Sequence, residues 1–481
     1  MPVRVHTPDG TKIRRAPRPE EAERRDERTE RDERAERDGR TGRDERDAHG
    51  DRGEREERDE RDRRDDDHER PMRGEEKRTV ALLGIPTLAL ALATTVVTTY
   101  VPVVAQGFVG STVVVGLIIG AEGIMAVWLP LLVGSWSDRL RTRIGGRLPF
   151  LLAGSPVLAA GLVALGAVHS AMTLALAAIV FFTGYFLAYE PYRALYPDAV
   201  PDEVAGRAQG TQATWRGAGT GLALLGGGLL LGLGTAVPFL VAAVVFVAAI
   251  AAFAVVVLRR GVPDRPRNDE EGVRDAARHL IGLLRAKRPL RAFLVANALW
   301  ELALGALKTF VVLYVSQGLG FSRAVAGLII GGVAVFVLLA SLGFGKLADR
   351  FGHVRVMACA LPVFGLGLLA PLLSSSHVLI AASMPFVAAG GGALMALPYA
   401  ILMPLMPEEE HGVLSGYYSF SRGLGTWLGP LLAGLSIALL GPAFPATAGY
   451  QAMWLPVSLA ALVSLVPLRA VAKAGAHNGD A

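Results

Sequence analysis

The chain has 481 residues, 52% of them hydrophobic, and a mean hydropathy of +0.39, so it is too long and too apolar for a single soluble domain. The formal net charge is +5, but residues 1–78 contain 24 Lys and Arg with 27 Asp and Glu, which leaves 25 basic and 17 acidic side chains for the rest. This basic excess lies in short loops between apolar runs, a pattern that membrane topology explains better than nucleic-acid binding.

Residues 1–78 are predicted to form a disordered, charged cytoplasmic tail. Arg, Asp and Glu make up 45 of residues 1–70, and no apolar periodicity marks a face that could be buried. The interleaved acids cancel most of the field of the arginines, so no nucleic-acid partner is expected. A transient helix, a contact with anionic lipid or RNA, and a start of translation at Met72 stay open as alternatives.

Twelve apolar runs of about twenty residues follow, each long enough at about 1.5 Å per residue to cross a bilayer core of roughly 30 Å. They do not alternate with period two, which excludes a strand barrel. We therefore predict an all-α membrane protein with one half at 79–258, a cytoplasmic central loop at 259–288, a second half at 289–468 and a cytoplasmic tail at 469–481. The predicted spans are 79–103, 111–134, 148–168, 171–195, 207–233, 236–258, 289–316, 323–345, 355–374, 377–402, 411–437 and 446–468.

Basic residues indicate the orientation of these spans. The loops after the second, fourth, sixth and eighth spans are rich in Arg and Lys, whereas the opposite loops contain only Arg323. By the positive-inside rule both termini and the central loop are cytoplasmic, and we expect a multi-pass protein of the plasma membrane. Within the central loop, Val273 to Arg285 could form an amphipathic helix on the membrane surface.

A charged, glycine-rich hinge sequence, GSWSDRLRTRIGGRLPF at Gly134–Phe150, separates the second and third spans, and a weaker copy, GKLADRFGHVR, begins at Gly345. The segment Gly116–Gly120 recurs as Gly327–Gly331 shortly before the second copy. Further positions recur at a constant offset of 206: Gly206, Gly210, Arg216, Gly217 and Gly219 correspond to Gly412, Gly416, Arg422, Gly423 and Gly425. The repeats predict two pseudo-symmetric six-helix halves with the substrate path between them.

The hinge sequence predicts a gating latch, a charge cluster that holds the cytoplasmic helix ends together in one conformation and breaks in the other. A carboxylate can accept hydrogen bonds from the exposed amides of a helix N-terminus and pair with arginine, while glycine permits close backbone approach. A topology signal alone would explain the arginines but not the repeated Gly-x-x-x-Asp-Arg. The predicted latch residues are Gly134, Asp138, Arg139 and Arg147 in the first copy and Gly345, Asp349 and Arg350 in the second.

Over about residues 79–470 the sequence resembles the major facilitator superfamily, which carries a G-x-x-x-D-[RK]-x-G-[RK]-[RK]-like motif between its second and third helices. The spacing after Arg139 is longer here, and SDR followed by GRLPF resembles the SDR and GRRRPF signature of the sucrose-transporter-like branch, near the glycoside-pentoside-hexuronide symporters. The segment PYRALYPD at 191–198 is similar to the R-A-L-L-x-D segment of the same branch. This resemblance implies proton-coupled sugar transport.

Ionisable side chains inside the spans are candidates for the transport pathway, because each would cost about 2.5 to 3.5 kcal/mol at the bilayer centre unless it is paired or faces a cavity. Glu190 and Arg193 lie one helical turn apart and can pair. Glu190 fits either the latch or a proton site, and the resemblance implies a substrate or coupling role for Arg193. Glu122 lacks a partner in its own helix and is either a neutral structural residue or a proton carrier. The equivalent places of Arg216 and Arg422 favour a symmetric structural role.

The seventh span contributes another candidate group. Glu301 and Lys308 lie two turns apart and share a face with Asn297, and Trp300 flanks that face. A carboxylate near an ammonium and an aromatic surface suits proton-linked binding of a polyhydroxylated ligand, since protonation changes which hydrogen bonds the acid makes. The alternative is an ion pair that only holds two helices together.

The sequence contains no nucleotide-binding GxxxxGK[ST] motif, metal-ligand cluster or nucleophile triad, so we expect no enzyme activity, no cofactor and no metal. Transport should instead use an ion gradient, in the first place of protons. The single cysteine, Cys359, excludes an intrachain disulfide. The expected partners are a small-molecule substrate and the lipid bilayer, and the chain is expected to act as a monomer.

The primary hypothesis is therefore a proton-coupled symporter that imports a sugar or glycoside by alternating access. In this hypothesis Glu301 and Glu190 are proton carriers, and Lys308 and Arg193 set their pKa values and orient the substrate. The alternative is a proton-driven exporter of a small hydrophobic or cationic compound. A sensor or scaffold that uses the charged tail is a third hypothesis.

Overall fold

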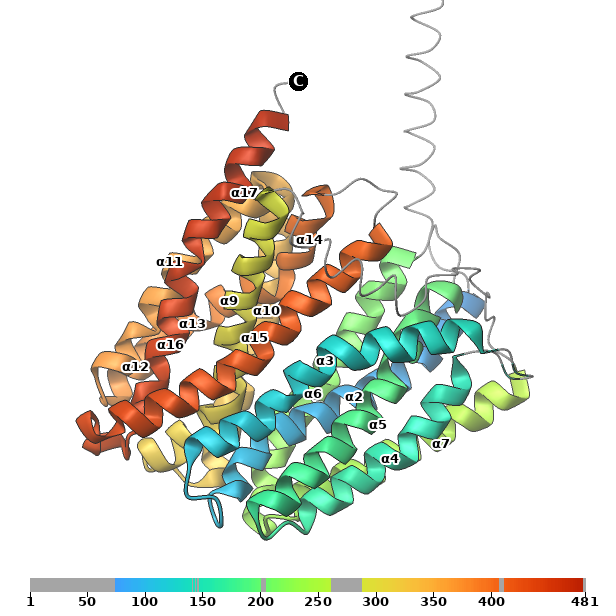
Figure 1. Cartoon of the computed structure of the whole chain (residues 1–481), viewed down its shortest axis with the longest axis horizontal. Helices are drawn as coiled ribbons and strands as arrows, with labels where there is room; N and C mark the ends of the chain where they lie inside the picture. The colour runs from blue at the N-terminus through green and yellow to red at the C-terminus, as the bar shows by residue number, and fades with distance from the viewer. Residues whose placement is uncertain are drawn as a thin grey trace, which may run out of the picture. The chain divides into compact units, whose positions relative to one another are not determined.

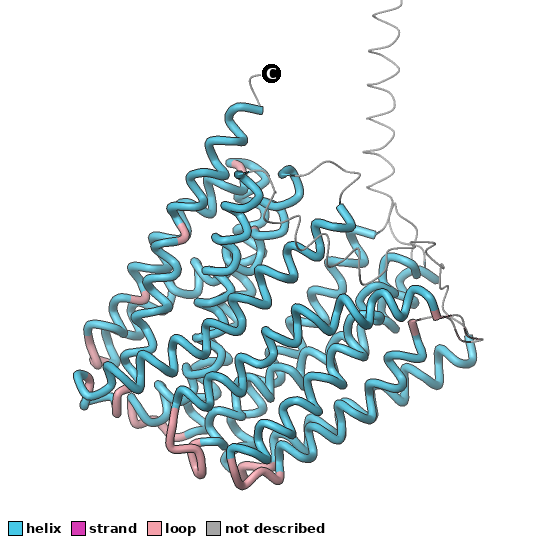
Figure 2. Tube along the Cα trace, in the orientation of Figure 1, coloured by secondary structure: helices cyan, strands magenta, loops and turns pink. Residues whose placement is uncertain are grey.

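The computed structural model describes residues 74–140, 142, 144, 147–199, 205–260, 288–405 and 411–478. The predicted tail up to residue 73 and the predicted amphipathic helix in the central loop lie outside these residues. In the described part, twelve helical segments are long and apolar enough to cross a membrane, which confirms the predicted all-α membrane fold. Figure 2 shows them as helices joined by short loops.

The N-terminal half consists of six unbroken helices. They are α2 (Gly74–Ala105), α3 (Thr112–Arg139), α4 (Leu148–Gly166), α5 (Ala171–Ala199), α6 (Ala205–Leu233) and α7 (Val237–Arg260). The first begins five residues before the predicted span, because Glu75 and Glu76 fit the positive N-terminal end of a helix.

The C-terminal half repeats this order with more interruptions. Its helices are α9 (Arg288–Leu313), α10 (Arg323–Phe351), α11 (His353–Gly367), α12 (Leu369–Leu373), α13 (His377–Ala396), α14 (Pro398–Leu402), α15 (His411–Leu440), α16 (Trp454–Val463) and α17 (Leu465–Asn478). A π-helical turn, η3 (Tyr314–Gly318), extends α9, and three 3₁₀ turns between Gly441 and Met453 connect α15 to α16.

Three predicted spans are present but contain breaks in the helix. The spans at 355–374 and 377–402 are each divided into two helices, the second of them just before Pro398, whose ring cannot continue the hydrogen-bond ladder. The last span begins in a 3₁₀ turn and divides at Ser464, and its helix continues to Asn478 through the predicted C-terminal tail.

The ends of the helices define two sides of the bundle. The hinge end is the side of Leu140–Arg147, and the far end is the side of the loops that begin at Gln106, Ala167 and Leu319. Helix boundaries at the far end have local causes: the Val325 amide donates a hydrogen bond to Ser322 Oγ over 3.3 Å and so begins α10. Gly352, with φ of 89°, ends α10 at the hinge end in a conformation that favours glycine.

The two halves pack through two equivalent helix pairs, α3 with α15 and α10 with α6 (Figure 1). Small residues bring these pairs together. A Cβ placed on Gly116 would lie 2.3 Å from the Pro430 carbonyl oxygen, and one placed on Gly228 would lie 2.6 Å from Gly327 Cα. The repeated glycines of the sequence therefore mark helix contacts, and the structure confirms the predicted pseudo-symmetric halves.

Three hydrogen bonds at the far end join the two halves. Gln317 Nε2 donates to Gln106 Oε1, and Gln106 Nε2 donates to the Tyr450 hydroxyl. Nearby, Thr112 Oγ1 donates to the Gly434 carbonyl over 2.7 Å. These contacts join the two halves at the far end.

Candidate functional site

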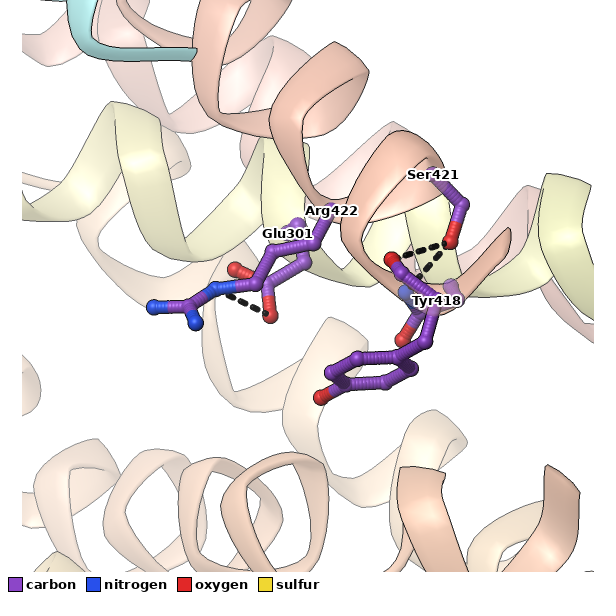
Figure 3. A network of polar contacts seen from close by, with 5 residues as sticks. Glu301, Tyr418, Ser421 and Arg422 are labelled. Carbon is purple, nitrogen blue, oxygen red and sulfur yellow. Dashed lines mark hydrogen bonds and ion pairs between the residues drawn. The ribbon is translucent and has the colours of Figure 1, made fainter. Parts of the chain in front are cut away.

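Glu301 on α9 forms an ion pair with Arg422 on α15, with 3.6 Å between Oε1 and Nε (Figure 3). The two helices can approach because Gly425 has no side chain: a Cβ there would lie 2.7 Å from Glu301 Cβ. The Glu301 side chain is 14% exposed and that of Arg422 is 45% exposed. The structure thus gives Arg422 a partner that the repeat pattern did not predict. The predicted influence of Lys308, on the same helix, on the Glu301 carboxylate stays a prediction.

Asn297 and Trp300 connect α9 to its neighbours within the C-terminal half. Asn297 is completely buried, and its Nδ2 donates to Ser421 Oγ over 2.9 Å. Ser421 Oγ in turn donates to the Tyr418 carbonyl (Figure 3). Trp300 Nε1 donates to Ser464 Oγ over 2.9 Å, between α16 and α17. Both side chains position the helix that carries Glu301, and their predicted contact with substrate stays a prediction.

The electrostatic partners of Glu122, on α3, lie in the other half. The half-buried carboxylate interacts electrostatically with Lys308 and Arg422, which attract it, and with Glu301, which repels it. Lys308 itself is exposed although it lies inside a span. An isolated acid in one half and a cation in the other are therefore parts of one charge network across the two halves.

Glu190 and Arg193 form the ion pair that their spacing predicts, with 3.4 Å between Oε2 and Nη2. Arg193 also interacts electrostatically with Arg422 and Tyr399 of the other half. The pair lies at the hinge end of α5, where both the latch and the pathway are predicted.

Tyrosines lie among these charges, although no tyrosine is among the predicted site residues. Tyr185 and Tyr189 stack with ring centroids 5.1 Å apart on α5, and Tyr399 meets Tyr418 edge to face at 5.6 Å on the C-terminal side. Tyr418 interacts electrostatically with Arg193 and Arg216 of one half and with Glu301 and Arg422 of the other. Tyr418 could have been predicted from the sequence as a site residue, because it lies four residues before Arg422 and residues i and i+4 share a helix face.

The predicted latch residues lie at the hinge end. Gly134, Asp138 and Arg139 belong to the last turns of α3, but their side chains are outside the described part, and Arg147 is buried just before α4. In the second copy, Asp349 lies 3.6 Å from His353 Nε2 on the neighbouring helix.

The other residues of the second copy lie in open surroundings. The Arg350 guanidinium is 5.4 Å from the centre of the Phe351 ring, and a Cβ on Gly345 would meet nothing within 4 Å. The latch therefore stays a prediction.

In the part of the chain that the structure describes, no group of three or more His, Cys, Asp or Glu side chains could hold a metal ion.

Two six-helix halves that meet along small residues, with ion pairs and exposed cations inside the spans, are the architecture of a membrane transporter. The chain belongs to the Major Facilitator Superfamily, whose sequence model matches residues 83–322 and 302–479.

Curated relatives include three named transporters. A triacylglyceride transporter of Mycobacteroides abscessus is 27% identical over 206 residues, which cover 40% of this chain and only 38% of that protein. A multi-drug resistance efflux pump PmrA homolog of Lactococcus lactis is 26% identical over 289 residues, covering 59% and 68% of the two chains. The multidrug resistance protein MdtG of Escherichia fergusonii is 26% identical over 280 residues, covering 57% and 65%.

Solved structures share the fold. A bacterial homolog of the human lysosomal transporter Spinster, in an inward-facing and occupied conformation, superposes with a TM-score of 0.70 at 15% identity, covering 84% of this chain and 98% of that one. The nucleoside transporter NupG superposes with a TM-score of 0.65 at 16% identity, covering 82% and 99%.

Proposed function

We propose that the protein is a proton-coupled secondary active transporter that works by alternating access in the plasma membrane, with both termini in the cytoplasm. The observation that carries this proposal is the Glu301–Arg422 ion pair, which lies within electrostatic reach of Glu122 in the other half. An acid paired with an arginine inside a membrane span is a natural proton carrier, because protonation removes the charge that holds its partner.

The proposed coupling works as follows. When Glu301 is ionised, it holds Arg422 through the ion pair. When Glu301 takes up a proton, Arg422 loses its counter-charge and is free to interact with Glu122 or with a bound solute. Proton uptake and solute binding are then linked, which is the requirement for symport or antiport. Glu190 with Arg193 offers a second pair of the same kind nearer the hinge end.

The first candidate substrate is a sugar or glycoside, imported with protons. It is supported by the resemblance of SDR and GRLPF in the hinge sequence to the sucrose-transporter-like branch. The polar network of tyrosine, arginine and glutamate side chains also suits a ligand with several hydroxyl groups.

Export of a small hydrophobic or cationic compound is the second candidate. It is supported by the relatives named PmrA homolog and MdtG, which are named for drug efflux and multidrug resistance. Overexpression would then give resistance to the exported compound. Either Glu122→Gln or Glu301→Gln would remove this resistance.

The test uses the full chain in proteoliposomes under an imposed proton gradient, with uptake of labelled disaccharides followed over time. We expect gradient-dependent accumulation, and we expect Glu301→Gln to reduce it by about tenfold or more while solute exchange without a gradient continues, since only the proton-dependent step is lost. Glu75→Gln, at an exposed position in the first turn of α2, is the matched control and should leave accumulation unchanged.

Accumulation by Glu301→Gln at the wild-type level would contradict the assignment of the proton carrier. Absence of gradient-dependent movement for sugars, with proton-dependent resistance in cells, would overturn the import hypothesis in favour of export.

A further inference from the structure

Arg216 on α6 is a cation inside a membrane span whose side chain is exposed and forms no ion pair with a side chain in the described residues. Its counterpart at the offset of 206 residues, Arg422, has a carboxylate partner in Glu301. An arginine within a span is costly unless it is paired or faces a cavity, so an unpaired Arg216 is a candidate for binding a counter-charge that comes from outside the protein.

The surroundings of Arg216 place it on the inner side of α6. Thr220 lies one turn further on the same helix face, and Thr95 Oγ1 on α2 donates to its hydroxyl over 3.4 Å. Next to Arg216, a Cβ on Gly217 would lie 3.4 Å from the Leu338 side chain of α10. At this level α6 is therefore flanked by α2 of its own half and by α10 of the other half.

Tyr418 connects Arg216 to the charge network of the opposite half. It interacts electrostatically with Arg216, Arg193, Arg422 and Glu301. Glu301 is already paired with Arg422, and Arg193 is already paired with Glu190, at 3.6 Å and 3.4 Å respectively. Of the three arginines around Tyr418, Arg216 is thus the one whose positive charge is not neutralised by a described carboxylate.

We propose that Arg216 binds an anionic group of the transported solute, so that the cargo is a small organic anion carrying a carboxylate or similar group. This inference rests on the proposed transport function; it keeps import of a glycoside only where the glycoside carries an acid, and it excludes a neutral or cationic cargo. A guanidinium suits the site because it stays charged and offers paired N–H donors to a carboxylate.

The two equivalent arginines then differ in one respect. The protein supplies the counter-charge of Arg422, whereas the cargo supplies that of Arg216. Protonation of Glu301 would free Arg422 and add a second cation beside the bound anion, so one proton and one anion would be carried with no change in the net charge of the site. Proton uptake would therefore strengthen anion binding.

The test measures binding to the purified full chain in nanodiscs by thermal stabilisation, with pairs of probes that differ in one charged group. One pair is nitrophenyl glucuronide with nitrophenyl glucoside, and another is hydrocinnamate with hydrocinnamamide. We expect at least one acid to raise the melting temperature and its neutral partner not to do so. Arg216→Gln should weaken binding of that acid about tenfold or more, and Arg216→Lys should restore part of it.

Arg323→Gln, an exposed arginine at the far end, is the matched control and should bind the acid as the wild type does. The inference is overturned if no acid stabilises the protein, if both members of each pair stabilise it equally, or if Arg216→Gln retains the preference for the acid.

A proton-flux measurement in liposomes with an internal pH dye separates this inference from the proposed function. Movement of protons with the neutral probes alone would support proton coupling and overturn the anion subsite. Binding of an acid that depends on Arg216 but moves no protons would support the subsite and contradict the proposed coupling.

Discussion

Asn297 is completely buried between α9 and α15, and its hydrogen bond to Ser421 lies one turn from the Glu301–Arg422 ion pair. The spacing in the sequence placed Asn297 on the same helix face as Glu301, but a face does not identify the neighbour that covers it. The structure shows that α15 supplies both partners, Ser421 for the amide and Arg422 for the carboxylate. Ser421 and Arg422, which are adjacent on α15, thus form a structural hydrogen bond and a candidate coupling ion pair, respectively.

We predict that Asn297→Ala lowers the free energy of unfolding by about 1 to 2 kcal/mol, because it removes a buried hydrogen bond and leaves a small cavity. A double-mutant cycle with Ser421→Ala should give a coupling energy of about 0.5 to 1.5 kcal/mol, measured by unfolding titrations in mixed micelles. Asn297→Leu, which fills the volume, serves as the control for the cavity. Strict additivity of the two alanine substitutions would contradict the bond.

The contact between α6 and α10 depends on two glycines that face each other. A Cβ on either Gly228 or Gly327 would lie 2.6 Å from the Cα of the other, which no side chain can accommodate without displacement of a helix. The equivalent contact between α3 and α15 uses Gly116 against Pro430. Both contacts bring the two halves together, so the repeated glycines control how closely the halves can approach.

We predict that Gly327→Val separates α6 from α10 and shifts the protein toward conformations open at the far end. The measurement is the distance between spin labels on cysteines at the exposed far-end positions His169 and Ser375, in a Cys359→Ser background, and the distance should increase.

Gly332→Val is the control on the same helix, because nothing lies within 4 Å of a Cβ at that position. An unchanged distance distribution in Gly327→Val, or an equal change in both variants, would show that the glycine contact does not set the conformation.

At the scale of the whole molecule, the proposed alternating access makes this structure one state of the transport cycle. Gln106, Gln317 and Tyr450 form a hydrogen-bonded connection between the halves at the far end, and Thr112 reaches Gly434 nearby. The opposite conformation must break these bonds, since each joins a residue of one half to a residue of the other.

Gln106→Leu should therefore destabilise the far-end contact and increase the population that is open there, because the substitution removes both of the hydrogen bonds that Gln106 makes. The same pair of spin labels reports the result. Ser170→Ala, which removes a far-end hydrogen bond within the N-terminal half, should leave the distribution as in the wild type. A wild-type distribution in Gln106→Leu would contradict the role of this connection.

The sequence by itself determined the class of fold and its symmetry. Runs of about twenty apolar residues can satisfy their backbone groups in a bilayer only as helices, and the repeats at Gly116 and Gly327 require two similar halves. The sequence also predicted the ion pair between Glu190 and Arg193, because two residues one turn apart on a single helix lie close together whatever the tertiary packing.

Only the tertiary structure decided which charges meet across helices. Glu301 lies two turns from Lys308 in the chain, yet its ion pair is with Arg422, more than a hundred residues away, because Gly425 lets α15 approach α9. Arg216 and Arg422 are equivalent in sequence, yet among the described residues only Arg422 forms an ion pair. Which charges form ion pairs depends on how the helices pack. Helix packing in turn depends on small residues, and the sequence does not show which helix each of them contacts.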